Sequence, residues 1–108
     1  MLDAAKAVQE FLKDKTYHAY STTRLLRNGV ERNVEIIGEA ASKIPKTYKD
    51  AHPEVPWKKI VAQRHVLIHE YGEIEDEMLW KVATVSVPEL ITLLEPLLPD
   101  LPEEYSSD

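Results

Sequence analysis

Apolar residues recur at intervals of three and four along most of the chain, which is the spacing of one face of an α-helix. No segment shows the alternation of apolar and polar residues that is typical of a half-buried strand. Only 3 of the 108 residues are glycine and 7% are aromatic, which argues further against a fold rich in strands and tight turns. The sequence therefore predicts an all-α fold.

Four main helices follow from this periodicity. The second begins after Thr16, a candidate N-cap, and continues as one helix of about eight turns until Pro45 ends it. In the fourth helix, Pro88 lacks the N–H group that a helix interior needs, so this helix is expected to be kinked or split there. A proline-rich connector before the third helix contains one short helical turn near residues 47–51. The predicted limits of the main helices are residues 2–14, 16–44, 57–71 and 74–97.

Two glycines, Gly29 and Gly38, lie inside the second predicted helix. Glycine in a helix interior costs about 1 kcal/mol relative to alanine, so each position calls for a structural reason. A close approach to another helix and a bend are both compatible with the pattern, and close packing is the favoured interpretation.

The helices are expected to pack as a single domain over residues 1–98, a four- to five-helix up-and-down bundle with short connections. Residues 99–108 contain two prolines and four acidic residues, a composition that predicts a disordered acidic tail.

The net charge of −6 argues, for the chain as a whole, against electrostatic binding to nucleic acid or to an anionic membrane. The charge is unevenly distributed, however. Residues 70–108 carry eleven acidic residues and one basic residue, whereas residues 36–69 carry six basic and three acidic residues. A locally positive surface is therefore expected on the middle segment.

The chain contains no cysteine, which excludes disulfides, cysteine-based zinc sites, iron–sulfur clusters and a thiol nucleophile. No apolar run approaches the length of a membrane span, and the N-terminus lacks the pattern of a signal peptide. We expect a cytoplasmic protein with no membrane partner.

The residues best suited to chemistry cluster on the third predicted helix. They are Arg64, His65, His69 and Tyr71, with Lys58 and Lys59 one to two turns earlier. On a straight helix His65 and His69 lie about 40° apart, whereas Arg64 and His69 lie about 140° apart. Arg64 and His69 can therefore converge only if their side chains wrap toward a common groove or if a second chain supplies one of them.

A histidine that titrates near neutral pH beside a permanently charged arginine can cleave RNA without a metal ion. The histidine takes a proton from the ribose 2′-hydroxyl or gives one to the leaving 5′-oxygen, and the arginine stabilises charge on the phosphate. Tyr71 could donate a hydrogen bond or stack on a base, and Lys58 and Lys59 are candidates for RNA contacts.

Two other interpretations of the same residues remain open at this point. Arg64 and Tyr71 could hold neighbouring helices together, with His69 interacting with the carbonyls at a helix end. Alternatively, His65 and His69 could form a metal-binding pair at i and i+4, although no third ligand is evident in the sequence.

The order Arg64, four residues, His69, one residue and Tyr71 resembles the motif of the HepT-like branch of the HEPN ribonuclease superfamily. The surrounding segments are similar to that family as well, and the similarity extends from about Leu2 to Leu98. These segments are ERNVEIIGEAA at 31–41, HPEVPW at 52–57, Trp80 and PEL at 88–90.

This resemblance implies a helical toxin of a toxin–antitoxin module, acting as a ribonuclease that uses neither metal nor cofactor. It implies a homodimer in which the motif helices of two chains form one shared RNA cleft. Arg64 and His69 would be the catalytic pair, supported by His65 and Tyr71. A minimal nucleotidyltransferase would be the antitoxin, with Tyr71 a candidate acceptor for AMPylation.

Two alternatives to this function come from other classes of protein. The chain could be a non-catalytic helical dimer that binds and modulates a nucleotidyltransferase, with the motif holding its interface together. It could also be a nucleotide-binding module in which Arg64 and the lysines hold phosphates.

Overall fold

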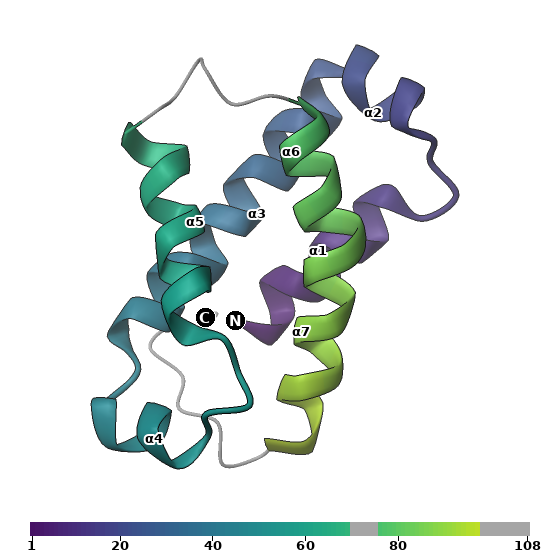
Figure 1. The fold of residues 1–108 in the computed structure, drawn as a ribbon. Helices are drawn as coiled ribbons and strands as arrows, with labels where there is room; N and C mark the ends of the chain where they lie inside the picture. The colour runs from purple at the N-terminus through teal and green to yellow at the C-terminus, as the bar shows by residue number, and fades with distance from the viewer. Residues whose placement is uncertain (70–75, 98–108) are drawn as a thin grey trace.

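The computed structural model describes residues 1–69 and 76–97, except for the side chains of residues 67–69, and this part of the chain consists of helices and their connections (Figure 1). No strand occurs within these ranges. The elements, in chain order, are α1 (Leu2–Leu12), α2 (Tyr17–Thr22), α3 (Arg24–Lys43), α4 (Lys46–Ala51), α5 (Trp57–His69), α6 (Asp76–Lys81), the π-helical turn η1 (Val82–Ser86), α7 (Val87–Leu94) and the 3-10 turn η2 (Glu95–Leu97).

Helix α3 is the centre of the bundle. It packs against α5 on one side and α1 on the other, and α1 in turn packs against α7 (Figure 1). Their apolar faces form one continuous core. Most of the apolar positions at helical spacing point into it, whereas Phe11, Leu25, Met78 and Val85 are exposed. The all-α bundle predicted from the sequence is therefore confirmed. Its largest fully buried side chains are Tyr20, Leu94, Val8, Val30 and Val55.

The prediction of one long second helix is wrong, because the chain breaks it at Thr23. The backbone of Thr23 is extended, with φ −109° and ψ 98°, and separates α2 from α3. The hydroxyl of Thr22 donates a hydrogen bond of 2.7 Å to the carbonyl of His18, and two adjacent β-branched residues lower the helix propensity further. The predicted cap at Thr16 is confirmed: its Oγ1 accepts a 3.1 Å hydrogen bond from the N–H of Ala19.

The predicted interruption near Pro88 takes the form of a π-helical turn. The N–H of Val87 donates to the carbonyl of Val82, a bond that spans five residues instead of four. This wider turn accommodates the proline that follows, whose ring would crowd a regular helical turn. The last helix is thus split into α6 and α7, although the whole segment still runs as one rod in Figure 1.

The short helical turn predicted in the connector is α4, which precedes the start of α5 at Trp57 as expected. The predicted tail at 99–108 and the predicted start of the fourth helix near Ile74 lie outside the described residues. None of the described helices has both the length and the apolar character that crossing a membrane would require.

Candidate active site on helix α5

The position of Arg64 is set by a close contact between α3 and α5. These two helices pack more extensively than any other pair in the described part of the chain. A Cβ atom placed on Gly38 of α3 would overlap the Cβ of Arg64, and it would lie 3.2 Å from the carbonyl oxygen of Ile60. Gly38 therefore marks a close helix approach, as the sequence indicated, and the residue that approaches it is Arg64.

The side chain of Arg64 is half-buried, and its charge is not neutralised within the described part of the chain. Its Nε atom is buried and finds no hydrogen-bond acceptor among the described residues. A buried donor without a partner is costly, so it calls for a specific explanation, of which a bound anion or a catalytic role is one. The Nε of Arg27 and the hydroxyl of Tyr20 share this property among the described residues. The Cβ and Cγ of Arg64 pack against Gly38 of α3, so these contacts agree with the alternative in which Arg64 holds neighbouring helices together as well as with a ligand-binding role.

His65 lies on a different face of α5 and is exposed. It lines a groove between α4 and α5 with a volume of about 710 Å³. The residues that line this α4–α5 groove are Lys46, Lys49, Asp50, Trp57, Lys58, Val61, Ala62, His65 and Val66.

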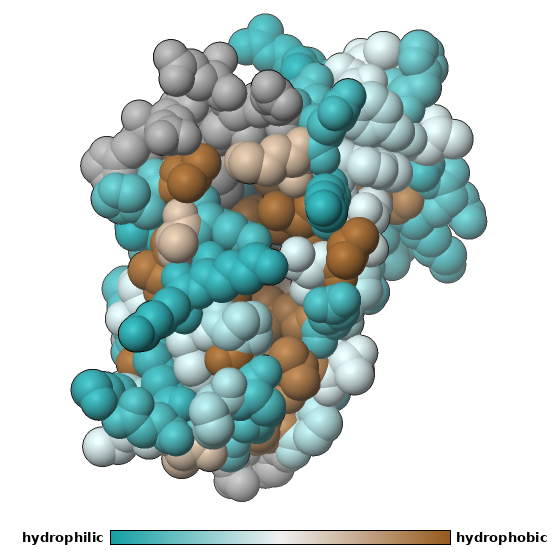
Figure 2. Space-filling view, in the orientation of Figure 1, coloured by the Kyte–Doolittle hydropathy of each residue, from teal (hydrophilic) through white to brown (hydrophobic). Residues whose placement is uncertain are grey.

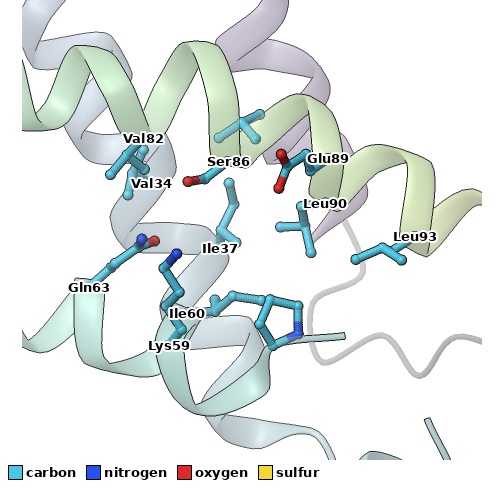
Figure 3. Close-up of a pocket in the computed structure, with 12 residues that line it drawn as sticks. Val34, Ile37, Lys59, Ile60, Gln63, Val82, Ser86, Glu89, Leu90 and Leu93 are labelled. Carbon is cyan, nitrogen blue, oxygen red and sulfur yellow. The ribbon is translucent and has the colours of Figure 1, made fainter. Parts of the chain in front are cut away.

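The structure separates the two lysines predicted to contact RNA. Lys58 lines the α4–α5 groove, whereas Lys59, one residue and thus about 100° further round the helix, lies on the side of α5 that faces α7. There, Lys59 and Gln63 project into a gap bordered by Ser86 and Glu89 (Figure 3). The two predicted RNA contacts therefore lie on different sides of α5.

The gap beside Lys59 is too small to hold a nucleotide. Its volume is about 60 Å³, against the several hundred cubic ångströms typical of ligand pockets. Most of its lining is apolar, and Figure 2 shows apolar side chains gathered in the furrow between α5 and the α6–η1–α7 segment. This gap is better described as a packing defect beside the core than as a substrate site.

The positive charge expected on the middle segment is partly neutralised by local ion pairs. Lys46 pairs with Asp50 at 2.7 Å, and Lys43 pairs with Glu39 at 3.7 Å. The hydrogen bond and attraction from Asp50 raise the pKa of Lys46. Both pairs are at i, i+4 spacing on exposed helix surface, where they contribute little to stability.

Lys46 and Lys49 line the same groove as Lys58 and His65. Both belong to the basic residues of the middle segment, but neither was predicted as a site residue. The i, i+3 spacing of Lys46 and Lys49 within a predicted helical turn was the signal available, since it places both on one face of that turn.

The other predicted site residues are described only in part. His69 is the last residue of α5, so its place on the helix is known, and Tyr71 lies outside the described residues. Among the described residues no group of three or more histidine, aspartate or glutamate side chains has the geometry of a metal site.

Comparison with known proteins shows the family. A family profile described as "Ribonuclease HepT-like" matches residues 1–97. The chain belongs to the HepT-like ribonuclease family. This confirms the family and the enzyme class, a ribonuclease, that the motif at Arg64, His69 and Tyr71 predicted.

Individual relatives of the HepT-like family cover most of this chain. "Putative RNase MJ1380" of Methanocaldococcus jannaschii is 39% identical over 83% of this chain and 83% of its own length. "Probable ribonuclease HepT" of Thermococcus cleftensis is 33% identical over 82% of this chain and 80% of its own length. No solved structure gave a significant match.

Proposed function

We propose that this HepT-like protein is the RNA-cleaving toxin of a toxin–antitoxin pair, a metal-independent ribonuclease that uses Arg64 and His69. The observation that carries the proposal is the state of Arg64. It is a half-buried arginine whose Nε has no partner among the described residues, and it packs against Gly38 from the helix that bears the family motif. Such a group is preorganised to accept an anion, and the phosphate of RNA is the anion that a ribonuclease must bind.

In the proposed reaction the ribose 2′-oxygen attacks the adjacent phosphorus, and the 5′-oxygen departs. His69 would move the proton, taking it from the 2′-hydroxyl or delivering it to the leaving oxygen. Arg64 would stabilise the negative charge that grows on the phosphate oxygens in the transition state. The reaction leaves a 2′,3′-cyclic phosphate on one fragment and a 5′-hydroxyl on the other.

The geometry of α5 favours a site shared between two chains. Arg64 faces α3, and position 69 lies about 140° further round the same helix. A homodimer that brings two α5 helices together would supply Arg64 from one chain and His69 from its partner to the same phosphate.

The proposed antitoxin is a minimal nucleotidyltransferase that acts in the cytoplasm and transfers AMP to Tyr71. The phosphate of AMP on Tyr71, two residues after His69, would compete with RNA for the charge of Arg64. The modification would therefore inhibit the ribonuclease directly.

The deciding experiment combines growth with cleavage. Expression of the wild-type chain should arrest growth, and the purified protein should cut transfer RNA in excess EDTA. His69→Ala should lose both effects while keeping the helical circular dichroism and melting temperature of the wild type. Cleavage that disappears with EDTA, or that persists in His69→Ala, would contradict the proposed mechanism.

A further inference from the structure

Arg27 and Asp76 form an ion pair between two helices that are 49 positions apart in the sequence. The Nη1 of Arg27, on α3, lies 3.5 Å from each carboxylate oxygen of Asp76, the first residue of α6. The two side chains are 35% and 37% exposed, so the pair is partly shielded from solvent. The pair therefore joins the start of α6 to α3, at the end of the bundle where α5 also ends (Figure 1).

The ion pair lies on the same face of α3 as the contact between Gly38 and Arg64. Arg27 precedes Gly38 by eleven residues, which is within about 20° of three full turns and about 17 Å along the helix. One face of α3 thus contacts α5 at Gly38 and α6 at Arg27. The proposed catalytic His69 lies between these contacts in the sequence, five residues after Arg64 and seven before Asp76. The segment that contains it is therefore attached to α3 on both sides.

The pair is a costly way to join two helices. The Nε of Arg27 is buried without a hydrogen-bond partner among the described residues, and so is the hydroxyl of Tyr20, which interacts electrostatically with both charges of the pair. Replacement of a shielded ion pair by apolar residues is often neutral or stabilising. A charged pair has one preferred geometry, however, whereas apolar contacts permit neighbouring registers. The position that the pair gives to α6 explains it better than stability does.

The charges around Arg27 argue against a bound anion at this point. Glu31 follows Arg27 by one turn of α3 and is half-buried. Burial, and then the charge of Glu35, raises the pKa of Glu31, and Arg27 lowers it by less. A phosphate here would therefore meet the carboxylates of Asp76 and Glu31. Although Arg27 and Arg64 both have a buried Nε without a partner, the surroundings of Arg27 suit a role within the fold.

We propose that Arg27 is a positioning residue for RNA cleavage. Through its ion pair with Asp76 it sets where α6 begins, and it thereby limits where the end of α5, with His69, can lie. Neither Arg27 nor Asp76 touches the RNA. The proposal rests on the proposed function, because it assigns a role in the same reaction.

The test replaces the ion pair by an apolar one. The double variant Arg27→Met with Asp76→Leu should keep the melting temperature of the wild type or raise it, and Glu77 keeps an acid in the first turn of α6. Its kcat should fall about three- to thirtyfold while KM stays within about twofold, because a small displacement of a catalytic group slows the reaction without removing a substrate contact. A melting temperature that falls together with kcat would assign the pair to stability and overturn the proposal.

Two single variants show whether the charge pair itself matters. Arg27→Lys keeps the charge and should retain kcat within about threefold, whereas Arg27→Gln should lose as much as the double variant. Lys6→Gln is the matched control, since Lys6 and Glu95 form another ion pair between distant elements, α1 and η2, at 3.6 Å. Its kcat should equal that of the wild type. Equal losses of kcat in Arg27→Lys and Arg27→Gln would overturn the proposal.

A second measurement does not depend on cleavage. Amide hydrogen exchange in the whole chain, followed by mass spectrometry, reports how often the last turn of α5 and the first turn of α6 open. Exchange in both turns should be about three- to tenfold faster in the double variant and unchanged in Lys6→Gln. Unchanged exchange, or unchanged kcat, in the double variant would overturn the positioning role. Faster exchange in a protein whose wild type cuts no RNA would support the contact and count against the proposed function alone.

Discussion

The Cβ of Arg64 occupies the space that a side chain on Gly38 would need. The Cγ of Arg64 and the carbonyl oxygen of Ile60 are each 3.2 Å from the same point, so two further atoms of α5 confine the position. Since two of these atoms are fixed close to the backbone, a side chain at Gly38 could not be accommodated by a rotamer change alone. Because Gly38 has no side chain, α5, which carries the proposed catalytic arginine, can pack this closely against α3.

Gly38→Ala should destabilise the protein by about 1–3 kcal/mol, the usual cost of overpacking, despite the gain in helix propensity. It should also slow RNA cleavage, because α5 must move away from α3 and takes Arg64 with it. Urea unfolding and single-turnover cleavage on the same preparations would measure the two effects.

Gly29→Ala is the matched control for this substitution. Its new Cβ would lie 3.2 Å from the ring of Phe11, which is 40% exposed and free to turn toward solvent. The free energy of unfolding should therefore stay within about 1 kcal/mol of the wild type, or rise, and cleavage should not change. Equal effects at the two glycines would show that the contact between α3 and Arg64 is not what makes Gly38 necessary.

Much of this fold could be predicted from the sequence because the apolar periodicity of each helix is strong. Two local features could not. The break at Thr23 depends on side-chain hydrogen bonds that compete with the helix, and residues on both sides of it fit one apolar pattern. The π-helical turn before Pro88 is one of several ways to accommodate a proline, and periodicity does not choose among them.

The sequence predicted the order of the candidate site residues along the chain, but it did not predict which elements their side of α5 faces. The motif located Arg64 correctly on α5. The interior glycines indicated a close contact between helices, but the sequence did not show that Arg64 is the residue in contact with Gly38. Lys58 and Lys59 were both predicted to contact RNA, but Lys58 lies on the side of α5 that faces α4, whereas Lys59 lies on the side that faces α7. Lys49 joins Lys58 only because α4 folds back on α5, which no local pattern specifies.

Arg64→Gln should reduce kcat by about 10²–10³-fold, the usual loss when a charge-stabilising donor is removed. Glutamine keeps the stem that packs against Gly38, and it removes a buried donor that has no partner among the described residues, so stability should be unchanged or slightly higher. Single-turnover cleavage with saturating RNA, together with thermal melting, would separate the two quantities.

Arg32→Gln provides the comparison for Arg64→Gln, since Arg32 is exposed and pairs with Glu35 at 3.2 Å on the same helix turn. The free energy of unfolding of Arg32→Gln should fall by less than about 1 kcal/mol, and its kcat should not change. If Arg64→Gln instead cut RNA at the wild-type rate, the catalytic role of Arg64 would be wrong.

Tyr20→Phe should stabilise the protein at high pH. Tyr20 is fully buried beside Trp80, with ring centroids 5.3 Å apart, and its hydroxyl has no partner among the described residues. Burial, with the nearby charge of Asp76, raises the pKa of Tyr20 far above its usual value. The unfolded chain ionises near pH 10 while the folded chain stays neutral, so stability is complete below pH 10 and falls as the pH rises above it.

The expected difference is up to about 1.4 kcal/mol for each pH unit above 10, lost by the wild type and not by Tyr20→Phe. Urea unfolding near pH 8 and near pH 11 would measure it. Near pH 8 the free energy of unfolding of the variant should equal or exceed that of the wild type, because the buried hydroxyl that is removed has no partner in the described part of the chain. Parallel losses in both proteins would show that Tyr20 is accessible to ionisation in the folded state.

Two inactive chains should restore activity when they are mixed. Arg64 faces α3 while position 69 lies about 140° away on α5, so the proposed dimer supplies the two groups from different chains. A two-fold dimer contains two such Arg64–His69 pairs, and a heterodimer of Arg64→Gln and His69→Ala would keep one of them intact. Since about half of randomly mixed dimers are heterodimers, mixing should return about a quarter of wild-type cleavage. Each variant alone should cut at about 1% of the wild-type rate or less. Activity that stays absent in a heterodimer isolated through two different affinity tags would place both groups on the same chain, and the shared cleft would have to be abandoned.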